Sequence, residues 1–210
     1  MPQMSKARYA LRVGTRRFMF GAVGLTLMGL AQHRLVLANQ PEASKQTMID
    51  LDIASELLMM RHADAPGYSD PANMTLNDCK TQRNLGSLGR EQAQRVGETL
   101  RQRGVKTATV WTSPWCRCVD TASLLGFDAP IIKDFLGSFF VQRDRSVGQT
   151  EALEAAVASW FARKPTTALL LVTHQVNIAA YSGQSTSSGE MLRIKTRKNG
   201  KPESYRRAID

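Results

Sequence analysis

The chain has 210 residues, of which 42% are hydrophobic and 22% are charged, which is typical of a globular domain and excludes a disordered or collagen-like protein. Its formal net charge is +10, but six of the positive charges lie in residues 1–38, which contain no acidic residue. The remaining 22 basic and 18 acidic residues give residues 39–210 a net charge of only +4. This charge suits a small anionic partner, and the chain carries no motif that reads nucleic acid.

Residues 1–38 have the layout of an export signal. A basic stretch precedes an uncharged, largely apolar run over 18–31, and small residues follow at 36–38. The segment "TRRFMF" is similar to a twin-arginine signal, and the apolar run is shorter than the roughly 20 residues that a spanning helix needs. We therefore expect cleavage after Ala31 or Ala38, leaving a periplasmic or secreted protein with no stable membrane span. An uncleaved membrane anchor is the alternative.

Residues 39–210 are expected to form a single domain in which apolar strands alternate with helices. Ser87 is expected to cap the first helix, at 87–104, and Gly104 is expected to end it. Residues after 196 form a basic C-terminal tail that we expect to be solvated. In chain order, the pattern predicts a strand at 56–61, a helix at 87–104, a strand at 107–114, a helix at 115–126, a strand at 129–136, a helix at 150–164, a strand at 167–174, a helix at 176–183 and a strand at 189–196.

This alternation predicts a three-layer α/β/α sandwich with a mostly parallel central sheet. In such sheets, functional side chains gather beyond the carboxyl ends of the strands. Arg61 and His62 end the first strand, and His174 ends the fourth. Ser113 ends the second strand, with Arg117 one helical turn later. Two arginines and two histidines should therefore meet at one edge of the sheet.

Two guanidinium groups beside two imidazoles favour an oxyanion site. Arginine holds phosphate oxygens in a bidentate manner and keeps its charge at every physiological pH. Histidine can act as a nucleophile near neutral pH. Transfer of a phosphoryl group depends chiefly on positioning and on stabilisation of negative charge. The predicted edge therefore has the residue types that phosphoryl transfer requires.

Three segments, "LLMMRHAD", "VWTSPWCRCVDTA" and "LLLVTHQ", carry a family resemblance. In order and spacing they resemble the signatures of the histidine phosphatase superfamily, in its phosphoglycerate mutase-like branch 1. The resemblance implies that His62 is the nucleophile that becomes phosphorylated, and that Arg61, Arg117 and His174 surround the phosphate. Gln175 follows the last motif and is expected to contribute to the phosphate pocket.

Three positions depart from the family pattern, and one of them is Gln175, which stands where the family usually has glycine. Ala63 stands where the family usually has glycine, and this should be tolerated where the backbone φ is negative. The family's carboxylic proton donor corresponds loosely to Asp134, with Glu190 and Asp64 as alternatives. The resemblance thus implies Asp134 as the general acid, on a shorter side chain than the usual glutamate.

The cysteines and the long polar loop between the first strand and first helix leave alternatives open. Cys79 can pair with Cys116 or Cys118, since an oxidising compartment permits a disulfide. The spacing of the cysteines does not suit a zinc site. In the loop, Arg83 and Asn84 either contact substrate or brace the loop.

The resemblance implies a metal-independent phosphomonoester hydrolase that needs no cofactor and acts on a small phosphorylated substrate. Two other functions stay open. One is a phosphate- or phosphosugar-binding module with little or no catalysis, and the other is a protein phosphohistidine phosphatase. The sequence indicates neither the physiological substrate nor the oligomeric state.

Overall fold

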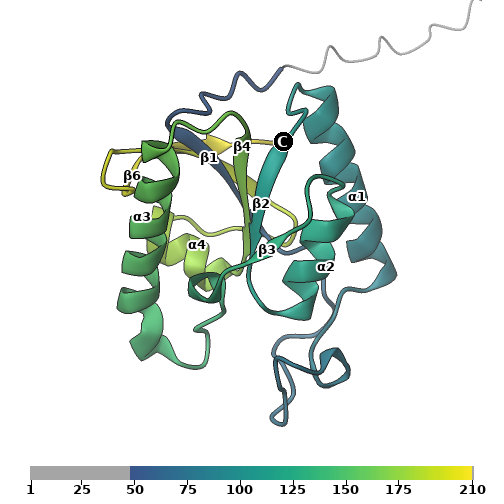
Figure 1. Cartoon of the computed structure of the whole chain (residues 1–210). Helices are drawn as coiled ribbons and strands as arrows, with labels where there is room; N and C mark the ends of the chain where they lie inside the picture. Colours follow the sequence, from purple (N-terminus) through teal and green to yellow (C-terminus); the bar gives the residue numbers. More distant parts are fainter. Residues whose placement is uncertain (1–47, 210) are drawn as a thin grey trace, which may run out of the picture. The chain divides into compact units, whose positions relative to one another are not determined.

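The central sheet has six strands in the order β3-β2-β4-β1-β5-β6 (Figure 1). The computed structural model describes residues 48–209, so the expected export signal lies outside the described residues. The strands β1, β2, β3 and β4 run parallel, whereas β5 and β6 pair antiparallel. Their bounds are Glu56–Arg61 for β1, Ala108–Thr112 for β2, Ile131–Ile132 for β3, Ala168–Thr173 for β4, Met191–Thr196 for β5 and Pro202–Arg207 for β6.

Helices cover both faces of this sheet, α1 and α2 on one and α3 and α4 on the other (Figure 1). They span Ser87–Gln102 (α1), Cys116–Leu124 (α2), Ser146–Ala162 (α3) and Gln175–Ser182 (α4). The expected three-layer α/β/α sandwich with a mostly parallel sheet is confirmed.

The apolar runs of β1 and β4 feed two separate cores because successive side chains of a strand point to opposite faces. Leu58 and Met60 pack with Leu100 of α1. Leu57 and Met59 instead join a second cluster that contains side chains of α3 and α4. All four strand residues are fully buried. Because both faces of β1 and β4 are buried, the sequences of these strands are continuous apolar runs. Each run ends where the strand leaves the core, and His62 and His174 follow at those points.

Several predicted boundaries were wrong. Gly86, not Ser87, is the N-cap of α1, and it provides no side-chain cap. The strand expected at 129–136 is reduced to the two residues of β3 and a 3-10 helix, Asp134–Leu136, because β3 is an exposed edge strand with little apolar burial. The helix expected at 150–164 begins four residues earlier, at Ser146.

The basic C-terminal tail is exposed, as expected, but residues 202–207 form a strand, β6, that the sequence analysis did not predict. This strand is mostly exposed, so it shows no apolar alternation that would reveal it in the sequence. The signal that was present is Asn199-Gly200, a typical hairpin turn pair, and Gly200 has a φ of +79°. The turn returns the chain antiparallel to β5 and makes β6 the edge of the sheet.

Helix α1 approaches the loop after β1 too closely for a side chain at Gly89. A Cβ added there would lie 1.9 Å from the backbone oxygen of Asp64, two residues beyond His62. We predict that Gly89→Ala lowers the free energy of unfolding by about 2 kcal/mol or more, as an overpacked site does. Gly148 in α3 is the matched control, since a Cβ there meets no atom within 4 Å.

Gly148→Ala should raise stability by about 0.5–1 kcal/mol, because alanine is the better helix former. Urea denaturation of both variants measures the difference. A Gly89→Ala variant as stable as Gly148→Ala would contradict the close approach of α1 to the chain beside His62.

Candidate active site

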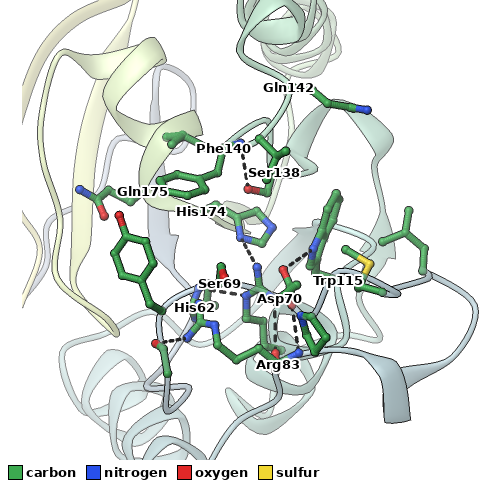
Figure 2. A pocket seen from close by; sticks show the side chains of 18 of the residues that line it. His62, Ser69, Asp70, Arg83, Trp115, Ser138, Phe140, Gln142, His174 and Gln175 are labelled. Carbon is green, nitrogen blue, oxygen red and sulfur yellow. Dashed lines mark hydrogen bonds and ion pairs between the residues drawn. The ribbon is translucent and has the colours of Figure 1, made fainter.

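The carboxyl ends of β1, β2 and β4 open into a cavity of about 920 Å³. Its lining includes Arg61 at the end of β1, His62 directly after it, Arg117 on α2, His174 directly after β4 and Gln175 at the start of α4. The sequence-predicted residues therefore meet at one edge of the sheet, with the exception of Asp134. Figure 2 shows His62 and His174 facing the same space.

The ring of His62 is held in one orientation and one tautomer. Its Nδ1 lies 2.8 Å from the backbone oxygen of Ala63, which can only accept a hydrogen bond, so Nδ1 carries the proton. Nε2 therefore carries a lone pair, and Nε of Arg117 donates to it over 3.2 Å. The arrangement leaves Nε2, the unprotonated nitrogen of a buried imidazole, as the candidate nucleophilic atom beside Arg117.

Ala63 itself fits its position without strain. Among residues 48–209 only Lys164 has a positive φ without being glycine, so the backbone at Ala63 lies in an ordinary region. Its amide donates to Oγ1 of Thr121 on α2 over 3.0 Å. The expectation that alanine is tolerated in place of the family's glycine is confirmed.

Arg117 lies between the two histidines and organises both. Besides donating to His62, its Nη2 lies 3.4 Å from Nδ1 of His174. A guanidinium only donates, so Nδ1 of His174 carries a lone pair, and its Nε2–H donates to Oγ of Ser113 over 2.8 Å. The ring of Trp115 stands edge-on to His174 with centroids 5.2 Å apart. Ser113 and Trp115 thus fix the second histidine from the side opposite Arg117.

Asp70 is the carboxylate that the sequence reasoning missed. Its Oδ1 accepts from Nη1 of Arg117 at 2.7 Å and from the backbone amide of Arg83 at 2.9 Å, and Oδ2 accepts from Nε1 of Trp115 at 3.2 Å. Burial raises the pKa of Asp70, but these hydrogen bonds outweigh it, so the pKa is lowered and the group is ionised. Asp70 is therefore suited to position Arg117 rather than to donate a proton.

Nothing in the sequence around Asp70 distinguishes it from the other polar residues of its loop. The loop is anchored by a disulfide between Cys79 and Cys116, which settles the pairing that the sequence left open. Cys118 is free and buried, and burial raises the pKa of its thiol to about 12, so it stays protonated. The disulfide ties the loop to the first turn of α2, directly beside Arg117.

Two further arginines line the cavity. Arg61 donates through Nη1 to the backbone oxygen of Thr186 over 2.9 Å. Arg83 donates to the backbone oxygens of Ala65 and Gly67, so it braces the loop while it also lines the cavity. The Nε atoms of Arg61 and Arg83 are buried without a hydrogen-bond partner among residues 48–209.

The three carboxylates that the resemblance suggested as proton donors lie elsewhere. Asp134 is exposed at the start of a 3-10 helix and does not line the cavity. Glu190 is ion-paired with Arg207 of β6 and accepts from the amide of Ser187. Asp64 is exposed as well, and all three are absent from the cavity lining. The structure therefore does not bring Asp134 to the site. β3 ends level with β2, since Ile132 pairs with Thr112, and Asp134 then begins an exposed 3-10 helix.

Burial and positive charge keep both histidines neutral. Burial lowers the pKa of His62 to about 3. The hydrogen bond to the oxygen of Ala63 raises that pKa, whereas the charge of Arg117 lowers it further. For His174, burial and then Arg117 lower the pKa well below its ordinary value of 6.5. Both imidazoles are therefore uncharged at neutral pH in this structure.

These pKa values predict that the domain loses stability as the pH falls from 6.5 toward 3. Below pH 6.5 the unfolded chain binds a proton at His62 that the folded chain does not bind until about pH 3. Between pH 7.5 and 5.0, His62 alone should cost about 2 kcal/mol. Urea denaturation in phosphate-free buffer measures this loss, and His62→Asn should be less pH-sensitive by that amount. Equal pH dependence of the two proteins would contradict a buried neutral His62.

Comparison with known proteins points to one family. The sequence model described as the histidine phosphatase superfamily (branch 1) matches residues 57–134, a range that contains His62, Asp70 and Arg117. Residues 57–134 of this chain therefore match the histidine phosphatase superfamily. No curated protein matches its sequence.

Solved structures share the fold of this chain. The protein histidine phosphatase SixA, solved with tungstate, is 17% identical with a TM-score of 0.51, and the match covers 72% of this chain and 94% of that one. A mycobacterial glucosyl-3-phosphoglycerate phosphatase, solved with VO3, is 18% identical with a TM-score of 0.55, and the match covers 74% and 98%. At these identities the likeness is one of fold.

In the described part of the chain, residues 48–209, no helix is both long and apolar enough to cross a membrane. Within the same range, no group of three His, Cys, Asp or Glu side chains is placed to hold a metal ion.

Proposed function

We propose that this chain is a phosphomonoester hydrolase that acts through a phosphohistidine on His62. The observation that carries the proposal is the neutral, buried imidazole of His62, which lines the cavity and whose unprotonated Nε2 lies beside Arg117. A neutral imidazole is a competent nucleophile, whereas an imidazolium is not. The match to the superfamily and the phosphatase neighbours support the same reaction class.

The proposed reaction has two displacements at phosphorus. In the first, Nε2 of His62 bonds to phosphorus as the bond to the leaving oxygen breaks, and that oxygen takes a proton from water at the open end of the cavity. In the second, water attacks the phosphohistidine, the N–P bond breaks, and inorganic phosphate leaves while His62 regains its neutral form. Arg61, Arg83 and Arg117 would bind the phosphoryl oxygens throughout. These fixed positive charges neutralise the phosphoryl group without requiring a metal ion.

Rapid-quench labelling tests this proposal. The protein spanning residues 39–210, incubated with a 32P-labelled monoester in EDTA, should retain label that survives alkali and is lost in acid. His62→Asn should retain none. Turnover of p-nitrophenyl phosphate should continue in EDTA and should be inhibited by vanadate. Phosphate binding without turnover or label would instead favour the binding module, and a strict metal requirement would contradict the mechanism.

We also infer that residues 1–38 direct export. The basic, apolar and small-residue layout of this segment supports the inference, and so does the Cys79–Cys116 disulfide, because disulfides persist mainly in oxidising compartments. Export argues against cytosolic phosphohistidine proteins as the substrate and favours a small phosphate ester outside the cytoplasm. Fractionation of the full chain in a bacterial host, with Arg16→Lys/Arg17→Lys as the signal variant, tests this. Retention of the wild-type chain in the cytoplasm would contradict export.

A further inference from the structure

The cavity extends well beyond the two histidines, toward the segment that joins Leu136 to α3. In Figure 2, His62 and Arg83 lie at one end, Gln142 lies at the other, and Phe140 lies between them. The far end is also lined by Arg143 and Arg145, which flank α3 at its N-terminal side. We call Tyr68, Phe140, Arg143 and Arg145 the distal subsite, since none of them contacts His62 or Arg117 in the interactions described above.

The charges that line the cavity exceed what one phosphate group needs. The lining contains a single carboxylate, Asp70, and five arginines, Arg61, Arg83, Arg117, Arg143 and Arg145, which leaves a net charge of +4. A phosphate monoester carries a charge close to −2 at neutral pH. The excess of about +2 matches the two arginines at the distal end. A cavity with this distribution concentrates anions that are charged at both ends.

The two distal arginines are free to bind an anion. Among residues 48–209 neither has a carboxylate within 4.0 Å of its guanidinium, although Asp144 lies between them in sequence and outside the cavity lining. Arg145 is held by a hydrogen bond from Nη1 to Oε1 of Gln142, 3.0 Å long. The guanidinium of Arg143 lies 5.9 Å from the centre of the Phe140 ring. Each arginine is thus partly ordered with donors left unused.

Aromatic surface separates the two charged ends. The rings of Tyr68 and Phe140 stand edge to face with centroids 5.8 Å apart, and Tyr68 is 84% exposed. Large exposed aromatic side chains beside a charged cavity are typical of a surface that packs against a ligand. They would contact the part of a substrate that lies between its phosphate and any second charge.

We propose that the distal subsite binds a second anionic group, carried by the leaving group of the substrate. This inference rests on the proposed phosphomonoesterase activity. The substrate class is then a phosphate ester with an apolar or ring-shaped middle and a carboxylate or phosphate at its far end. Arg143 and Arg145 determine specificity for that end, whereas Arg61, Arg83 and Arg117 bind the phosphate that is transferred.

The test compares substrates that differ by one charge. The probes are 4-(phosphonooxy)phenylacetate and its neutral amide, and the corresponding phenylpropanoate pair, whose longer spacer tests reach. In at least one pair, the kcat/KM of the wild type should be about tenfold higher for the acid than for the amide. A charge-assisted hydrogen bond stabilises a complex by about the free energy that corresponds to this factor. In Arg143→Gln/Arg145→Gln the acid-to-amide ratio should fall to within about twofold of one.

Arg163→Gln is the matched control, because Arg163 also lies over an aromatic ring, that of Trp160, but outside the cavity. It should leave the acid-to-amide ratio and the turnover of p-nitrophenyl phosphate unchanged. A wild-type ratio near one in both pairs, or a ratio that survives the double substitution, overturns the distal subsite alone. Absence of wild-type turnover on p-nitrophenyl phosphate and all four probes overturns the proposed function, and the subsite with it.

Discussion

His62→Asn should lower kcat/KM for p-nitrophenyl phosphate by about 10³-fold or more, because it removes the atom that bonds to phosphorus. Asparagine is the suitable replacement, since its amide can still donate to the oxygen of Ala63 as Nδ1 of His62 does. Arg117 loses its hydrogen bond to Nε2 of His62 but keeps its ion pair with Asp70. We therefore expect inorganic phosphate to bind the variant within about fivefold of the wild type, measured by calorimetry, because arginine supplies most of the phosphate hydrogen bonds.

The separation of chemistry from binding is the informative part of this result. A variant that loses both turnover and phosphate binding would show that His62 holds the site together rather than attacking phosphorus. A variant that keeps more than about a tenth of the activity would contradict covalent catalysis at His62 altogether.

Arg117→Gln should be the second severe change, with loss of both activity and stability. Its guanidinium contacts both histidines and forms an ion pair with Asp70, and the two side chains are 4% and 17% exposed. Removing it should lower kcat/KM by about 10²–10³-fold, as loss of a transition-state donor does. It should also lower the free energy of unfolding by about 3 kcal/mol, because Asp70 is left ionised and poorly solvated.

The double variant Arg117→Gln/Asp70→Asn separates these two effects. It should recover most of the lost stability, since no unpaired charge remains, but not the lost activity. Arg90→Gln is the control, because Arg90 and Asp120 form an ion pair of the same 2.7 Å length on the surface, where it should contribute at most about 1 kcal/mol. Recovery of activity in the double variant would show that Arg117 acts only on folding.

The residues at the strand ends were predictable because the apolar pattern that defines each strand extends over only a few neighbouring residues. Arg61, His62 and His174 follow runs whose length and apolarity fix them as buried parallel strands, and parallel strands end at a common edge. Arg117 lies in the first turn of α2, four residues after Ser113, so its position at the edge follows from the same rule. The pocket around His62 could therefore be assembled from sequence spacing and side-chain chemistry.

Asp134 and Asp70 show where such reasoning ends. Asp134 was expected at the site because the family's proton donor follows the third strand, but β3 is only two residues long and Asp134 begins an exposed 3-10 helix. Asp70 lies in a loop without periodicity, and its position depends on contacts with Arg83, Trp115 and Arg117 that are distant in sequence. No local pattern encodes such contacts.

By itself, the sequence determined the layered α/β fold, the edge at which two histidines and two arginines meet, and the family whose signatures the chain resembles. These follow from periodicity and motif order, which act over a few residues at a time. The tertiary structure decided which carboxylate joins the site, which cysteine pairs with Cys79, and that residues 202–207 form an edge strand. It also revealed the distal arginines, since the loops that line a cavity are placed by long-range packing rather than by local preference.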